Sequence, residues 1–106
     1  MINKVNWFKK DLDEYQRIHK KYLLHQAVEK NNKSVIKLLL DTGAEVDTKD
    51  NNGMTPLHWA ALNNVLDVAR LLLDNGADTT ILDIIGRNAL EIAVRPEMKA
   101  LLTPAP

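Results

Sequence analysis

Three histidines, His19, His25 and His58, are the side chains of this sequence best suited to bind a metal. The chain holds no cysteine, so a zinc site would have to combine these imidazoles with carboxylates. Zinc motifs place ligand pairs only a few residues apart, whereas His25 and His58 are 33 residues apart. A further step of 33 residues reaches Glu91 and not another histidine. We therefore expect structural histidines, with no bound metal and no cofactor.

Groups for covalent or acid–base catalysis are also scarce. Ser34 is the only serine, no glycine-flanked nucleophile motif surrounds it, and it suits a capping role at a helix start. Acidic residues recur at one spacing, Asp41 with Asp74 and Asp50 with Asp83. A catalytic pair should be unique, so recurring carboxylates indicate a shared structural role. No glycine-rich phosphate loop is present. The sequence thus predicts a protein that is not an enzyme.

Composition narrows the class of protein further. The 106 residues carry fourteen basic and fourteen acidic side chains, and this balance argues against a nucleic-acid binder or a polybasic membrane anchor. Hydrophobic residues make up 45% and charged residues 26%, which is typical of a chain that folds. We expect a cytoplasmic monomer; a nuclear location or secretion by a dedicated system stays open.

The strongest pattern in the sequence is a period of 33 residues. Without gaps, residues 22–54 and 55–87 are identical at 13 of 33 positions, among them a Leu-His pair, a Leu-Leu-Leu-Asp run and a Gly-Ala pair. Self-similarity at a fixed period of this length is the signature of a repeat protein. We therefore expect a short linear stack of repeated units and not a domain built around one globular core.

Each unit reads as two helices and a glycine-containing turn. In the second unit Thr55 is placed to cap a helix that Pro56 begins, because proline at the first helical position sacrifices no hydrogen bond. Asn63-Asn64 is expected to end that helix, since asparagine tolerates the left-handed conformation. A second helix follows and ends at Asn75-Gly76. The extended segment to Gly86 then forms a hairpin with a glycine turn.

The motif Gly53-Met54-Thr55-Pro56-Leu57-His58-Trp59-Ala60-Ala61, followed by Gly76-Ala77-Asp78, resembles an ankyrin repeat. The resemblance covers residues 22–102, as repeats 22–54 and 55–87 and a shortened capping repeat 88–102. It implies an all-α repeat fold, an ankyrin-type solenoid of helix-turn-helix pairs with β-hairpin connections. The first repeat departs from the family by Tyr22-Leu23 in place of Thr-Pro. Asn31 and Asn64 replace the usual glycine.

Both ends of the stack need covering. Residues 1–21 are predicted to form an amphipathic capping helix, whose apolar side, including Trp7 or Phe8, covers the first repeat; its apolar positions are Val5, Phe8, Leu12, Tyr15 and Ile18. A helix that swaps onto a partner or a second copy is the alternative. At the other end, Asn88 and Glu91 have capping-box spacing, Pro96 begins a short helix, and residues 103–106 form a frayed tail.

The resemblance implies a non-enzymatic module, an adaptor, scaffold or inhibitor, that binds another protein through its hairpin tips and the concave face of its first helices. The alternatives are a self-associating structural module and a secreted, host-directed effector. It also implies that His25 and His58 bond neighbouring loop backbone. The positions mapped to partner binding are Asn51, Asn52, Met54, Trp59, Leu62, Asn63, Leu82, Ile84, Ile85, Arg87 and Arg95.

Two of these positions are unusual in type. Ile84 and Ile85 occupy a hairpin tip where polar residues are expected, whereas the preceding tip carries Asn51 and Asn52. We hypothesise that Ile84 and Ile85 contact the partner, with Leu82, Met54 and Leu62 joining them in one apolar patch; burial against their own neighbours is the alternative. Trp59 has two interpretations that stay open, packing between neighbouring helices or an anchor on the concave face.

Overall fold

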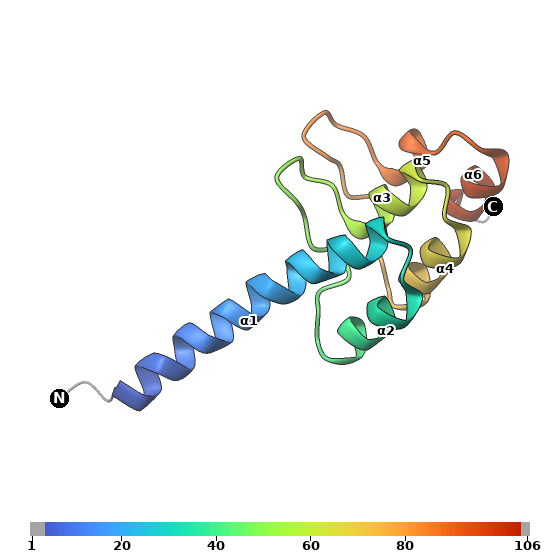
Figure 1. Cartoon of the computed structure of the whole chain (residues 1–106). Helices are drawn as coiled ribbons and strands as arrows, with labels where there is room; N and C mark the ends of the chain where they lie inside the picture. Colours follow the sequence, from blue (N-terminus) through green and yellow to red (C-terminus); the bar gives the residue numbers. More distant parts are fainter. Residues whose placement is uncertain (1–3, 105–106) are drawn as a thin grey trace.

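The protein is a stack of three helix pairs, joined by two long loops that project to one side (Figure 1). The computed structural model describes the backbone of residues 4–104 and the side chains of residues 14–104. Helices α1 and α2 form the first pair, α3 and α4 the second, α5 and α6 the third. Their bounds are Lys4–Glu29, Lys33–Asp41, Pro56–Leu62, Leu66–Asp74, Ala89–Ile92 and Pro96–Leu102. Within residues 4–104 there is no β-strand, so the hairpin connections are loops without a ladder.

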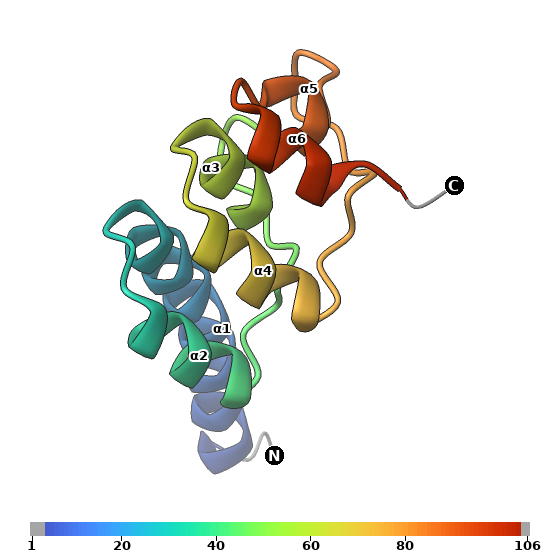
Figure 2. The ribbon, with the colours of Figure 1, turned by 90° about the vertical axis from the view of Figure 1, so that its right-hand side faces the viewer.

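Side views of the ribbon show the three pairs one above another, with the outer helices α2, α4 and α6 on one side (Figure 2). The core runs through the whole stack as a line of small and branched apolar residues. Its fully buried members include Leu24, Ile36, Leu57, Leu72 and Met98. Each pair therefore buries its apolar face only by lying against its neighbours, as expected for a repeat protein.

Local signals in the second repeat act as the sequence predicts. The Thr55 hydroxyl accepts the His58 backbone N–H and caps α3, which begins at Pro56. Asn64 has a φ of 55° and Asn31 a φ of 56°, so asparagine makes the left-handed turn between the helices of both full repeats. The expected break at these positions is confirmed.

The shortened third repeat also follows its predicted signals. Asn88 and Glu91 form a capping box: the Asn88 side chain accepts the Glu91 N–H, and the Glu91 side chain accepts the Asn88 N–H. The second helix of this repeat, α6, begins at Pro96. The capping role expected of Ser34 is wrong, because Asn32 is the N-cap of α2 and accepts the Val35 N–H.

The N-terminal helix is the main departure from the prediction. No break separates residues 4–21 from the first repeat, because α1 runs without interruption from Lys4 to Glu29. Its C-terminal part is buried at Leu24, whereas Tyr15 is 61% and Ile18 is 56% exposed. Nine helical residues span about 13 Å, so a straight helix carries Tyr15 past the edge of the stack. The expectation that Tyr15 and Ile18 cover the first repeat is therefore wrong.

The same expectation for Val5, Trp7, Phe8 and Leu12 concerns side chains that lie outside the described ones. Figure 1 shows α1 projecting beyond the helix pairs on the side to which the loops extend. This projection leaves one face of α1 beside the loop that follows α2.

Candidate functional site at the hairpin loops

Two long loops lie side by side and carry most of the residues that the sequence assigns to partner binding (Figure 1). We call them the first hairpin loop (residues 43–54) and the second hairpin loop (residues 76–87). Two hydrogen bonds join them: the Ile84 N–H donates to the Asn52 carbonyl at 3.0 Å, and the Asp78 N–H donates to Asp47 Oδ1 at 3.0 Å. The loops therefore form one connected surface.

Each tip is held by one aspartate. In the second loop, Asp83 Oδ1 accepts the N–H groups of Ile85 and Arg87 at 2.9 Å each, and Asp83 Oδ2 pairs with the Arg87 guanidinium at 2.9 Å. These bonds, led by the Arg87 backbone N–H, hold the pKa of Asp83 below its usual value although its burial acts in the opposite direction. The tip is thus fixed by charge-assisted bonds.

Asp50 performs the same task in the first loop. Its Oδ1 accepts the N–H groups of Asn52 and Met54, again at 2.9 Å each. Burial raises the pKa of Asp50, but these bonds and one from Trp59 outweigh it, so the pKa lies below its usual value. The shared structural role predicted for Asp50 and Asp83 from their 33-residue spacing is confirmed.

The two motif histidines tie each inner helix to the loop that follows it. His58 Nε2 lies 2.9 Å from the Arg87 carbonyl, and His25 Nε2 lies 3.2 Å from the Met54 carbonyl. His58 Nδ1 accepts the Thr55 N–H at 3.1 Å, so the proton sits on Nε2, which donates to Arg87. The predicted bond to neighbouring loop backbone is confirmed for His58, and His25 lies within bonding distance of both the Met54 carbonyl and, through Nδ1 at 3.0 Å, the Lys21 carbonyl of α1.

Trp59 links the second repeat to the first. Its indole N–H donates to Asp50 Oδ2 at 2.8 Å, and its ring is half-buried against the core. This geometry supports the packing interpretation and leaves part of the ring accessible. No signal in the sequence identified Asp50 as its partner, because the two lie in different repeats.

The second tip is apolar and accessible. Ile84 and Ile85 are each 72% exposed, and Leu82 in the same loop is 52% exposed. Burial of the two isoleucines against their own neighbours is therefore excluded. The first tip, with Asn51 and Asn52, is exposed and polar.

The remaining assigned residues do not gather around this tip. Met54 is wrongly placed in the exposed patch: its side chain is only 7% exposed, because it packs into the core below the loop. Leu62 and Asn63 are exposed but lie at the end of α3 that is remote from the loops, and Arg95 lies between α5 and α6. Arg87 is half-buried and held by Asp83.

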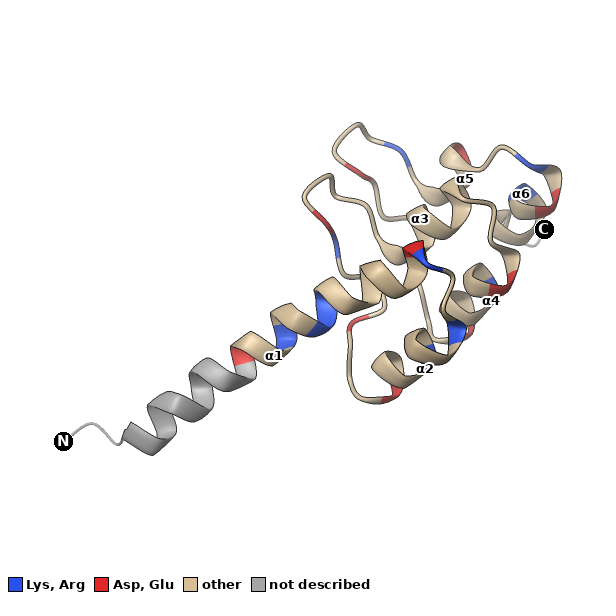
Figure 3. Cartoon of the chain, viewed as in Figure 1, with Lys and Arg blue, Asp and Glu red and all other residues tan. Residues whose placement is uncertain are grey.

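The described residues contain no group of three or more His, Asp or Glu side chains arranged to hold a metal ion. Every buried side-chain nitrogen and oxygen among them has a hydrogen-bond partner, so the polar groups of the interior serve the fold. Basic and acidic positions alternate over the ribbon (Figure 3). No helix in the described part of the chain is long and apolar enough to span a membrane.

Stacked helix pairs, paired loops and histidine links define an all-helical repeat domain. A model of the ankyrin repeat family, described as three repeat copies, matches residues 2–83 and residues 24–102. The chain belongs to the ankyrin repeat family. Domains of this family are generally protein-binding modules and are typically non-catalytic.

Similar proteins agree with this assignment. Ankyrin repeat protein FPV219 of Fowlpox virus (strain NVSL) is 53% identical over 38 residues, which are 36% of this chain and 9% of that protein. Protein FPV223 of the same virus is 51% identical over 37 residues, which are 35% of this chain and 26% of that protein. The crystal structure of the ankyrin repeat domain of Bcl-3, a member of the IkappaB family, superposes with a TM-score of 0.73 at 32% identity. That match covers 74% of this chain and 35% of the Bcl-3 chain.

Proposed function

We propose that this chain is a non-catalytic adaptor, scaffold or inhibitor that binds a protein partner through the tip of the second hairpin loop. The observation that carries the proposal is the pair Ile84 and Ile85, two branched apolar side chains that are each 72% exposed. Adjacent exposed apolar residues on a loop tip are typical of an interaction site. Leu82 extends the apolar surface along the same loop.

The support of the tip makes it suited to binding. Asp83 fixes the backbone on both sides of Ile84 and Ile85, and the Ile84 N–H is bonded to the neighbouring loop. A loop already held in one conformation loses little entropy on association, so more of the contact energy is retained as affinity. Branched side chains add to this effect because they have few rotamers to lose.

The experiment is the double substitution Ile84→Asp with Ile85→Asp. Affinity capture from cells followed by mass spectrometry should identify proteins retained by the wild type and lost by the variant, and the purified partner should then bind the variant at least tenfold more weakly. The matched control is Leu38→Asp with Val94→Asp, which adds the same charges at two exposed apolar positions outside the loops. Unchanged affinity of a folded Ile84/Ile85 variant for the partner would refute the proposal.

Self-association is a second candidate function, favoured by the exposed face of α1. Tyr15 stacks on His19 with ring centroids 5.5 Å apart, and Tyr22, one turn further, is 59% exposed. These residues have the spacing of a helix–helix contact. Light scattering at micromolar concentration separates the candidates, because a dimer that Tyr15→Glu dissociates would identify this face as its contact.

A further inference from the structure

Equivalent positions of the two hairpin loops can be compared directly, because they are 33 residues apart. The comparison shows that the first hairpin loop has hydrogen-bond donors without an acceptor among the described residues. In the second loop, the N–H groups of Asp78 and Ile84 donate to a carboxylate and a carbonyl of the preceding loop. The residues 33 positions earlier are Glu45 and Asn51. Among the described residues, neither the Glu45 N–H nor the Asn51 N–H has an acceptor. The first loop therefore presents an open edge with the same pattern of donors.

The open edge exists because α1 stands where a preceding hairpin would lie. The same offset places residues 10–20 opposite the first loop, and these residues are helical. A helix bonds its own backbone internally and offers no carbonyl to a neighbouring edge. Glu45 and Asn51 consequently border a space that the helix lines and does not fill.

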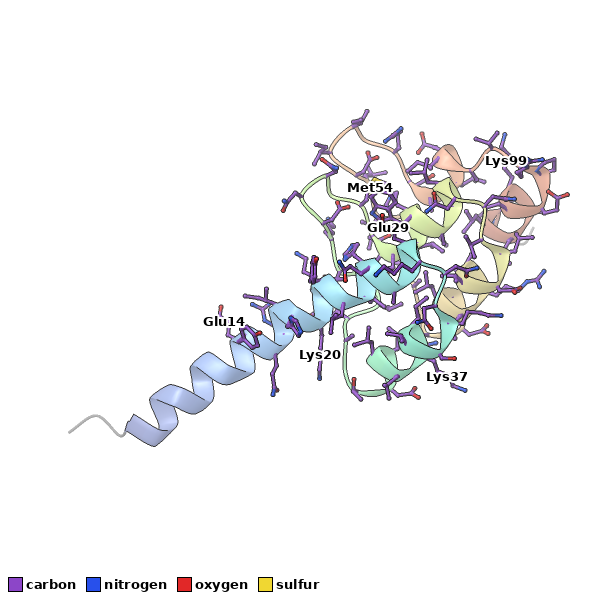
Figure 4. The ribbon with its side chains drawn as sticks, viewed as in Figure 1. Glu14, Lys20, Glu29, Lys37, Met54 and Lys99 are labelled. Carbon is purple, nitrogen blue, oxygen red and sulfur yellow. The ribbon has the colours of Figure 1, made fainter. Side chains whose placement is uncertain are left out.

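This space is a groove of about 640 Å³ between α1 and the first loop. Ile18, Tyr22 and Ala44 supply apolar lining, and Glu45 and Asn51 line the groove from the loop side. The groove is partly open to solvent, so a segment of a partner can enter it. Figure 4 labels Glu14 and Lys20 on the α1 side of this region.

Charge around the groove favours an anion. Arg17, Lys20 and Lys21 line it from α1, and Glu45 and Asp50 line it from the loop. Both Asp50 oxygens are already bonded, to Trp59 and to the N–H groups of Asn52 and Met54. Lys20 donates to the Thr42 carbonyl at 2.7 Å and retains further donors. Arg17 is 66% exposed beside Glu14 at 3.7 Å.

We propose that this groove binds an extended acidic segment of a partner protein, which adds to the edge of the first hairpin loop. One of its backbone carbonyls accepts the Asn51 N–H, and an acidic side chain five residues earlier accepts the Glu45 N–H, as Asn52 and Asp47 do for the second loop. Addition of an extended segment to an open edge is an established mode of peptide recognition. The surface is distinct from the Ile84 and Ile85 tip.

The probe is a fluorescein-labelled peptide with the sequence of residues 44–54, because this segment supplies the acceptors that the second loop uses; it carries three acidic residues and one lysine. Fluorescence anisotropy with the full chain, titrated to about 1 mM, should show binding that weakens as salt is added. A peptide with Asp47→Asn should bind several-fold more weakly.

Asn51→Pro is the decisive variant. Asn51 follows Asp50 in a turn closed by the Gly53 N–H and the Asp50 carbonyl at 3.0 Å, a position that proline favours. The substitution therefore removes the donor without removing a bond of the fold, and binding should weaken about fivefold. Lys21→Glu should weaken it further, whereas Val94→Asp, at an exposed position between α5 and α6, should leave it unchanged.

Three outcomes would overturn the proposal. The first is no binding of the peptide by the wild-type chain at the highest concentration. The second is equal binding by Asn51→Pro when circular dichroism shows that this variant is folded. The third is a wild-type dimer that Asn51→Pro converts to a monomer, because the occupant of the groove would then be a second copy of the chain.

Discussion

Replacing His58 by alanine tests whether the motif histidine stabilises the stack through its hydrogen bonds. His58 is 1% exposed, accepts the Thr55 N–H through Nδ1 and donates to the Arg87 carbonyl through Nε2. The matched substitution is His25→Ala, at the same position of the first repeat, where the ring is only half-buried. The two variants remove the same side chain from two different surroundings.

The loss of unfolding free energy in each variant depends on which polar groups are left without any hydrogen-bond partner. The Arg87 carbonyl still accepts the Asp83 N–H, and the Met54 carbonyl still accepts the Asp50 N–H, so both acceptors stay satisfied. In His58→Ala the buried Thr55 N–H is left without an acceptor, which costs about 1–3 kcal/mol beyond the roughly 1 kcal/mol of a lost hydrogen bond. In the first repeat the residue equivalent to Thr55 is Tyr22, which lies inside α1, so its N–H is not left without an acceptor when His25 is removed. We expect a loss of about 3 kcal/mol for His58→Ala and about 1 kcal/mol for His25→Ala.

Urea unfolding followed by far-ultraviolet circular dichroism measures both losses. With a slope of roughly 1.5 kcal/mol per molar urea, His58→Ala should lower the midpoint by about 2 M and His25→Ala by about 0.7 M. Equal losses for the two variants would refute the reasoning, because burial and the orphaned Thr55 N–H would then not set the cost. A His58→Ala loss below about 1 kcal/mol would refute it as well.

Two further predictions concern the loops. In thermal or urea unfolding, Gly53→Ala should destabilise the protein by about 2 kcal/mol or more and Gly86→Ala by about 1 kcal/mol. Both glycines have a positive φ, 72° and 90°, which alanine adopts only with strain. Only at Gly53 would an added Cβ also lie 3.0 Å from the Ile84 nitrogen. The free energy of unfolding should also decrease as the pH is lowered below 3.8, the usual pKa of an aspartate, because Asp50 and Asp83 have lowered pKa values in the folded protein. The stability that these two carboxylates contribute is present above pH 3.8 and is lost as the pH falls through their lowered pKa values. Asp83→Asn should therefore make the melting temperature decrease less between pH 4 and pH 2.

Much of the fold could be predicted because its signals are local. The cap at Thr55, the left-handed turn at Asn64 and the capping box of Asn88 and Glu91 depend on residues within four positions of one another. The sequence also predicted the common role of Asp50 and Asp83, since each carboxylate bonds N–H groups two and four residues ahead. Both partners of each of these hydrogen bonds lie within a few residues of one another, so a short stretch of sequence is enough to predict them.

The candidate site was predicted less completely, because exposure depends on neighbours. Met54 and Ile84 are both apolar loop residues, yet one packs into the core and the other is exposed. The helical periodicity of Tyr15 and Ile18 predicted a buried face, but both side chains are more than half exposed, and Ile18 only borders the groove beside the first hairpin loop. A periodic pattern identifies an apolar face and does not supply the surface that covers it.

The sequence by itself determined the 33-residue repeat, the turns at Asn31 and Asn64, the helix starts at Pro56 and Pro96, and the identity of the residues at each loop tip. These depend on backbone propensity and on contacts a few residues apart. Only the tertiary structure decided that α1 continues unbroken past the stack and that its projection leaves the Glu45 and Asn51 donors open. The reason is physical: whether an edge is paired depends on what the rest of the chain places beside it.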